Sequence, residues 1–119
     1  MFNLDLKDKV ILITGGSDGL GYASAELLSS EGANVIICGR RGDYLSEKAK
    51  TISENTNNNV LAIQADVSKA EDCKRLVEET ISKFKKIDIL VNNAGASAAA
   101  LFEDVSDKNW EDDINLKLM

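Results

Sequence analysis

The residues best placed to do chemistry are three glycines, Gly15, Gly19 and Gly21, which follow an apolar run. The run, Val10–Ile13, predicts a buried strand, and residues 20–30 after it predict an amphipathic helix. A helix that begins at such a turn presents unpaired N–H groups and the positive end of its dipole. Glycine suits the turn because positive φ costs it little and the missing Cβ lets a ligand approach. The spacing therefore predicts a site for an anion such as a pyrophosphate.

Polar residues follow the later apolar runs and form a second group of candidates. They are Arg40-Arg41 after Asn34–Cys38, Asp66-Val67 after Val60–Ala65, and Asn92-Asn93-Ala94-Gly95 after Ile87–Val91. Two arginines at a strand end can bind a phosphate through charge-assisted hydrogen bonds, and solvated turn charges are the alternative. Asp66 could equally cap the helix that follows it, and the asparagine turn could be chosen for its conformation alone.

Composition and charge exclude several classes of function. The chain has 119 residues, of which 44% are hydrophobic, and a net charge of −6. We expect one domain, and we expect neither nucleic acid nor membrane as a partner, because both favour a basic face. No apolar run approaches the roughly 18–20 residues of a membrane span. The chain contains no histidine, so no metal site is expected. Cys38 and Cys73 are expected to be reduced thiols of a cytoplasmic protein.

Apolar strands that alternate with helices predict the fold. Helices are expected over residues 20–30, 43–56 and 68–84, the last with Ser68 and Glu71 as a capping box. This order predicts an α/β protein with a doubly wound parallel sheet (Rossmann-like) and the strand order 3-2-1-4. The sheet is expected to be incomplete at its fourth strand. That unpaired edge would recruit another chain, so we expect a homo-oligomer.

Four of these motifs together resemble the short-chain dehydrogenase/reductase family. They are TGGSDGLG over Thr14–Gly21, CGRR over Cys38–Arg41, Asp66-Val67, and NNAG over Asn92–Gly95. The resemblance covers essentially the whole chain and implies that residues 1–119 are the N-terminal, dinucleotide-binding half of a longer enzyme. It also implies hydride transfer between a nicotinamide and a small alcohol or ketone. The family's catalytic serine and Tyr-x-x-x-Lys pair are expected beyond Met119, so the 119 residues alone are expected to be inactive.

The resemblance also implies roles in cofactor binding. It places the pyrophosphate turn at Gly15, Ser17, Asp18, Gly19, Leu20 and Gly21, the adenosine side at Arg40, Arg41, Asp66 and Val67, and the ribose and nicotinamide side at Asn93, Ala94 and Gly95. Arginines after the second strand favour NADP(H), because they can bind a 2′-phosphate. Asp18 stands where NADP-using relatives often have a basic residue, so NAD(H) stays possible.

A last helix is expected after the NNAG turn, with Ser106 as its N-cap and Val105 and Trp110 as a hydrophobic staple. Relatives place a catalytic asparagine on this helix, seven residues beyond the tryptophan. Seven residues beyond Trp110 is Lys117, and Asn115 fits only if the alignment shifts by two. The alternative to an enzyme is a non-catalytic module that binds a dinucleotide or a partner.

Overall fold

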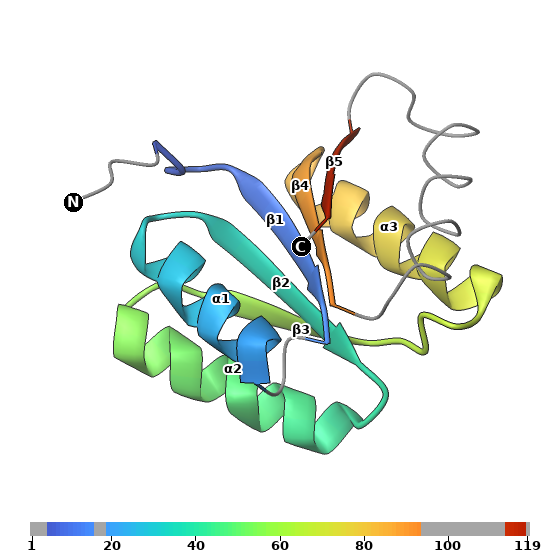
Figure 1. Ribbon diagram of the computed structural model, residues 1–119, viewed down its shortest axis with the longest axis horizontal. Coiled ribbons are helices and arrows are strands. Elements are labelled where there is room, and N and C mark those ends of the chain that lie inside the picture. The colour runs from blue at the N-terminus through green and yellow to red at the C-terminus, as the bar shows by residue number, and fades with distance from the viewer. Residues whose placement is uncertain (1–4, 16–18, 94–113, 119) are drawn as a thin grey trace.

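The computed structural model describes residues 5–15, 19–93 and 114–118. Its elements alternate along the chain (Figure 1). They are β1 (Val10–Thr14), α1 (Gly19–Ser30), β2 (Asn34–Gly39), α2 (Gly42–Thr56), β3 (Val60–Gln64), α3 (Ala70–Phe84), β4 (Ile87–Asn92) and β5 (Ile114–Leu118). The first seven elements are those expected from the sequence, with bounds that differ by no more than two residues.

The five strands form one parallel sheet with the order β3-β2-β1-β4-β5. The predicted doubly wound order 3-2-1-4 is therefore confirmed. Helices α1 and α2 cover one face of the sheet, and α3 covers the other (Figure 1). The chain reverses its direction of winding at β1, which pairs with both β2 and β4. In doubly wound sheets the ligand crevice lies outside the carboxyl ends of the strands at this reversal.

The prediction that the sheet ends at β4 is wrong, because β5 pairs with β4 in parallel. Ile87 is opposite Ile114, and Val91 is opposite Lys117. The sequence signal for this strand is the alternation Ile-Asn-Leu-Lys-Leu over 114–118, which has the period of a strand. The helix expected to reach Lys117 is corrected for the same reason. Its predicted start, with Val105, Ser106 and Trp110, lies outside the described residues.

The sheet separates two apolar clusters because successive side chains of a strand point to opposite faces. Ile11 and Ile13 of β1 belong to the cluster under α1 and α2. Val10 and Leu12 belong to the cluster under α3. Both clusters are continuous across the neighbouring strands, so the carboxyl ends of the strands are held on a rigid support. No helix in the described ranges is both long enough and apolar enough to cross a membrane.

Helix α1 packs on the sheet through small residues. Its buried positions are Gly21, Ala25 and Ser29, whereas Leu20 and Leu27 are 64% and 56% exposed. The leucines follow helical spacing, but the close approach of α1 to the sheet turns the small residues inward. Leu28 is partly buried against the cluster under α1 and α2, so the leucines of this helix divide between its inner and outer sides.

Asp88 ties the start of β4 to the start of β1. Its Oδ2 accepts a hydrogen bond of 2.8 Å from the Val10 N–H and lies 3.1 Å from Lys86 Nζ. Partial burial of the carboxylate works toward a higher pKa, but the Val10 hydrogen bond and the nearby lysine charges outweigh it and lower the pKa of Asp88. The hydrogen bond from Val10 to Asp88 thus adds a pH-dependent contact between β1 and β4.

Both cysteines are free and buried. Burial raises the pKa of the Cys38 thiol to about 12. Burial also raises the pKa of the Cys73 thiol to about 11. Neither thiol is therefore activated as a nucleophile, because the thiolate is the reactive form.

Candidate functional site

The carboxyl ends of β1 and β4 are locked together by one buried hydroxyl. The Thr14 hydroxyl donates to Asn92 Oδ1 over 2.8 Å and accepts from the Asn93 N–H over 2.9 Å. Thr14 is fully buried. Because Thr14 is opposite Asn92 in the sheet, these bonds fix the point where the glycine turn leaves β1 and the asparagine turn leaves β4. Thr14 was not among the expected site residues, although its place between strand and glycines was a signal for it.

The three glycines do different work in the turn between β1 and α1. Gly15 and Gly19 have φ of +68° and +55°, which side chains other than glycine rarely adopt. A Cβ on Gly21 would overlap the Gly15 carbonyl oxygen and lie 2.9 Å from the Gly15 carbonyl carbon. A Cβ on Gly19 would meet no atom of the described residues within 4 Å, its chain neighbours aside. The turn is thus closed at Gly21 and open at Gly19, where another molecule can approach the backbone.

A buried donor on Asn93 lies beside this turn. Its Nδ2 has no hydrogen-bond partner among the described residues and is 2.8 Å from the place where a Gly21 Cβ would stand. A buried amide without an acceptor costs about 1–3 kcal/mol. An oxygen-rich ligand in the turn would supply acceptors there. Asn93 and the open backbone at Gly19 therefore both fit a dinucleotide at this place.

The other expected residues of this region divide into two groups. Leu20 lies at the N-terminus of α1 with its side chain exposed. Ser17, Asp18, Ala94 and Gly95 lie outside the described residues. The turn formed by Gly15, Gly19, Gly21 and Asn93 is the part of the predicted pyrophosphate and ribose site that the structure brings together.

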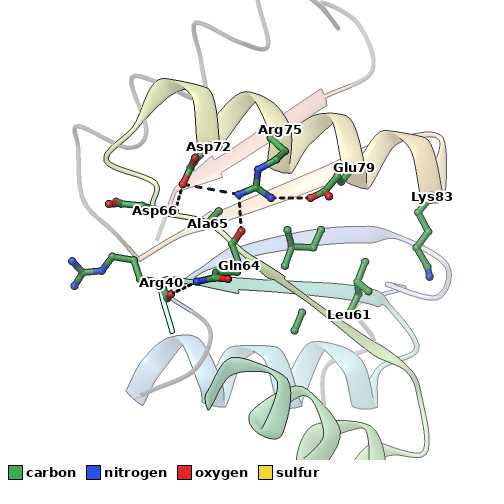
Figure 2. A pocket seen from close by; sticks show the side chains of 11 residues that line it. Arg40, Leu61, Gln64, Ala65, Asp66, Asp72, Arg75, Glu79 and Lys83 are labelled. Atoms are coloured by element: carbon green, nitrogen blue, oxygen red, sulfur yellow. Dashed lines mark hydrogen bonds and ion pairs between the residues drawn. The ribbon is translucent and has the colours of Figure 1, made fainter. Parts of the chain in front are cut away.

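Arg40 and Arg41 follow β2 and are both exposed. The Arg40 carbonyl accepts a bond of 2.8 Å from Gln64 Nε2 at the end of β3. In Figure 2 the Arg40 side chain extends outward at the end of a groove, on the side of Asp66. The groove has a volume of about 720 Å³ and runs between β3 and α3. The positive charge of Arg40 therefore stands at the carboxyl edge of the sheet, at the mouth of this groove.

Arg75 of α3 lines the groove and bonds across it to the edge strand β3. Its guanidinium donates to the Gln64 carbonyl over 2.7 Å and to Glu79 Oε2 over 3.2 Å, as Figure 2 shows. This bond satisfies a carbonyl that faces away from β2. Sequence reasoning missed Arg75, since no local pattern relates a helix residue to a strand eleven positions earlier.

Asp66 lies at the same end of the groove as Arg40. Its Oδ1 accepts from the Ser68 hydroxyl over 2.6 Å and from the Ser68 N–H over 3.0 Å. These bonds lower the pKa of Asp66. Asp66 thus stabilises its own loop, and Ser68 is not the N-cap of α3, because Lys69 holds that position without a side-chain cap. Val67 follows, half-buried against the cluster under α3.

The chain does contain one Tyr-x-x-x-Lys spacing, Tyr44 with Lys48. The expectation that no tyrosine of residues 1–119 has a lysine four positions later is therefore wrong, while the expectation that the catalytic pair lies beyond Met119 stays a prediction. The pair lies on α2, whose N-cap residue is Arg41. Lys48 Nζ lies 5.1 Å from the centre of the Tyr44 ring, and Arg41 Cζ lies 4.3 Å from the same ring. The ring thus contacts cations at the adenosine side of the expected site.

Lys117 and Asn115 lie on β5 and not on a helix. Lys117 is opposite Val91 in the sheet. The helical count of seven residues from Trp110 therefore does not apply to them, and the choice between the two as a catalytic residue loses its basis. Among residues 5–15, 19–93 and 114–118, no group of three metal-ligating side chains occurs.

Comparison with known proteins identifies the family. The family model described as short chain dehydrogenase matches residues 9–119. The 11-beta-hydroxysteroid dehydrogenase 1A of Arabidopsis thaliana is 41% identical over 107 residues, which are 90% of this chain and 31% of that protein. An uncharacterized oxidoreductase of Staphylococcus saprophyticus is 39% identical over 116 residues, 96% of this chain and 50% of that protein. The chain thus spans between about a third and a half of these relatives.

Solved structures agree with the fold. L-sorbose reductase from Gluconobacter frateurii, complexed with NADPH and L-sorbose, matches with a TM-score of 0.78 and 32% identity over 84% of this chain and 46% of that one. An NAD+-bound xylitol dehydrogenase matches with a TM-score of 0.71 and 28% identity, over 76% of this chain and 35% of that one. Both nicotinamide cofactors therefore occur among the structures similar to this chain.

Proposed function

Because the chain belongs to the short-chain dehydrogenase family, we propose that it is the N-terminal, cofactor-binding part of an NADP(H)-dependent oxidoreductase. Its substrate class would be a small molecule with an alcohol or ketone group. The bound cofactor would supply a hydride, and this chain would bind and orient the cofactor. The observation that carries the proposal is the turn with Gly19 open to solvent and the unpartnered Asn93 amide beside it.

We assign each part of the cofactor to residues of this chain. The backbone at Gly15, Gly19 and Gly21 would bind the pyrophosphate at the N-terminus of α1. Asp66 and Val67 would contact the adenine. Asn93 would reach the ribose and nicotinamide side, where the carboxyl end of β4 adjoins that of β1.

Two arginines after β2 support NADP(H) over NAD(H). No acidic residue stands at positions 39–42, where a carboxylate would repel a 2′-phosphate. Arg40 can donate a pair of charge-assisted hydrogen bonds to that phosphate, and such bonds are worth about 1.5–3 kcal/mol each. A single arginine of this kind therefore accounts for a preference of tenfold or more.

Titration with NADPH and NADH tests the proposal. We expect NADPH to bind at least tenfold more tightly, and R40E to abolish this preference because it places a negative charge beside the phosphate. K50E is the matched control, since Lys50 is exposed on α2 and the variant carries the same charge change. Failure of the chain to bind either cofactor would overturn the proposal, and equal effects of R40E and K50E would overturn the role of Arg40.

A non-catalytic dinucleotide-binding module is the second candidate. It is favoured by the contacts of Lys48 Nζ with the Tyr44 and Tyr22 rings, which give the one Tyr-x-x-x-Lys spacing of residues 1–119 a role in packing. Oxidation of NADPH by a panel of ketones, measured on the protein isolated from its native source, distinguishes the two, because the module would bind cofactor without turnover.

We further propose a cytoplasmic location and self-association. The two free, buried thiols support the first. The exposed Leu20 and Leu27 on α1 support the second. Light scattering of the purified protein tests the association, and L20E with L27E would weaken it.

A further inference from the structure

A chain of cations and rings joins the start of α2 to α1. Arg41, the N-cap residue of α2, stacks on the ring of Tyr44 at 4.3 Å. Lys48 Nζ lies 5.1 Å from the Tyr44 ring and 5.1 Å from the ring of Tyr22 on α1. Cations within about 6 Å of a ring centre are attracted to its face. The two helices lie side by side on one face of the sheet (Figure 1), so the cluster spans their junction.

The two arginines after β2 have different surroundings. Arg40 extends at the mouth of the groove beside Asp66 (Figure 2). Arg41 is turned toward α2, where its guanidinium meets the Tyr44 ring. A long exposed arginine has many rotamers, and a ring under its guanidinium restricts them. The uncharged Tyr44 ring therefore restricts the position of the Arg41 charge.

We propose that Tyr44 is a positioning residue for cofactor choice, which holds the Arg41 guanidinium at the 2′ side of the adenosine with Lys48 behind the ring. The inference rests on the proposed binding of NADP(H). In it Arg40 and Arg41 approach a 2′-phosphate from the β3 side and the α2 side. Tyr44 and Lys48, which share the Tyr-x-x-x-Lys spacing, then serve recognition of the phosphate and take no part in proton transfer.

The position of Lys48 agrees with this role. Among the described residues no carboxylate lies within ion-pair distance of its ammonium group, and its contacts are the two rings. Its charge therefore adds to the positive potential around Arg41. A 2′-phosphate adds charge beside Arg41 that an unphosphorylated ribose lacks, so the effect is expected to be larger for a ligand that carries the 2′-phosphate.

Calorimetric titration with 2′,5′-ADP and with 5′-AMP separates the phosphate from the rest of the adenosine. For Y44L we expect the affinity for 2′,5′-ADP to fall about two- to fivefold, the range of an exposed cation–π contact, and the affinity for 5′-AMP to stay the same. For Y44F, which keeps the ring, we expect both affinities within about twofold of the parent. Thermal unfolding of each variant verifies that it is folded.

The outcomes distinguish the inference from the function on which it rests. A parent protein that prefers 2′,5′-ADP, with a Y44L variant that keeps the full preference, would overturn the role of Tyr44 alone. A Y44L variant that loses both ligands equally would show a structural role and overturn it too. A parent protein without preference for 2′,5′-ADP would overturn the proposed cofactor choice, and the inference with it.

Discussion

Replacement of Gly21 by alanine tests the glycine turn most directly. The added Cβ would overlap the Gly15 carbonyl oxygen, lie 2.9 Å from the Gly15 carbonyl carbon, and crowd Asn93 Nδ2 at 2.8 Å. The Gly15 backbone cannot yield easily, because its N–H donates to the Cys38 carbonyl over 3.1 Å. Overpacking costs about 1–3 kcal/mol. We expect the upper end, a loss of about 3 kcal/mol in the free energy of unfolding, because the obstructing atoms are backbone.

Urea unfolding followed by circular dichroism measures this loss, and two other glycines serve as comparisons. A Cβ on Gly42 would lie 3.1 Å from Gln64 Oε1, the far end of a flexible side chain, so G42A should change stability by less than about 0.5 kcal/mol. Gly19 has positive φ and open space, so G19A should cost about 1–2 kcal/mol and should also weaken cofactor binding. A G21A variant as stable as G42A would refute the proposed closure of the turn.

Three further predictions follow from buried and charged groups. T14V should cost about 3 kcal/mol, because it removes two hydrogen bonds of a buried hydroxyl, whereas T14S should cost less than half of that in the same urea assay. The pKa of Asp88 is lowered in the folded protein, so its contribution to stability is complete above the ordinary carboxyl pKa of about 4 and is lost as the pH falls through the lower folded value. D88N should therefore lose stability less steeply than the parent when both are titrated with acid. Parallel curves of stability against pH for the two proteins would contradict this. Cys38 and Cys73, with pKa values of about 12 and 11, should resist a thiol reagent at pH 8 and react after unfolding; fast modification of the folded protein would disprove their burial.

The sequence determined the elements and their order from local patterns. Continuous apolar runs predicted β1 to β4, and the Gly15, Gly19 and Gly21 spacing predicted where α1 begins. These patterns are local because burial on both faces makes a strand apolar throughout, and positive φ restricts a turn position to glycine. The reversal at β1 followed from right-handed crossovers in a doubly wound sheet that is covered on both faces.

Contacts that residue spacing does not reveal decided the rest. Ser68 and Glu71 have the spacing of a capping box, yet the Ser68 hydroxyl bonds Asp66 and α3 begins at Ala70. Leu20 and Leu27 follow helical spacing, yet both are exposed, and the fully buried positions of α1 are the small residues Gly21, Ala25 and Ser29. A local sequence pattern limits the conformations that a segment can adopt, and contacts with neighbouring residues decide which of these conformations forms.

The sequence by itself determined that this chain has a doubly wound sheet with a glycine turn at its centre, because the strand and turn preferences are properties of single segments. Only the tertiary structure decided that β5 closes the edge of β4, that Thr14 locks β1 to β4, and that Lys48 of α2 contacts the Tyr22 ring of α1. Each of these is a pairing or contact, and its free energy exists only after folding has brought the two partners together.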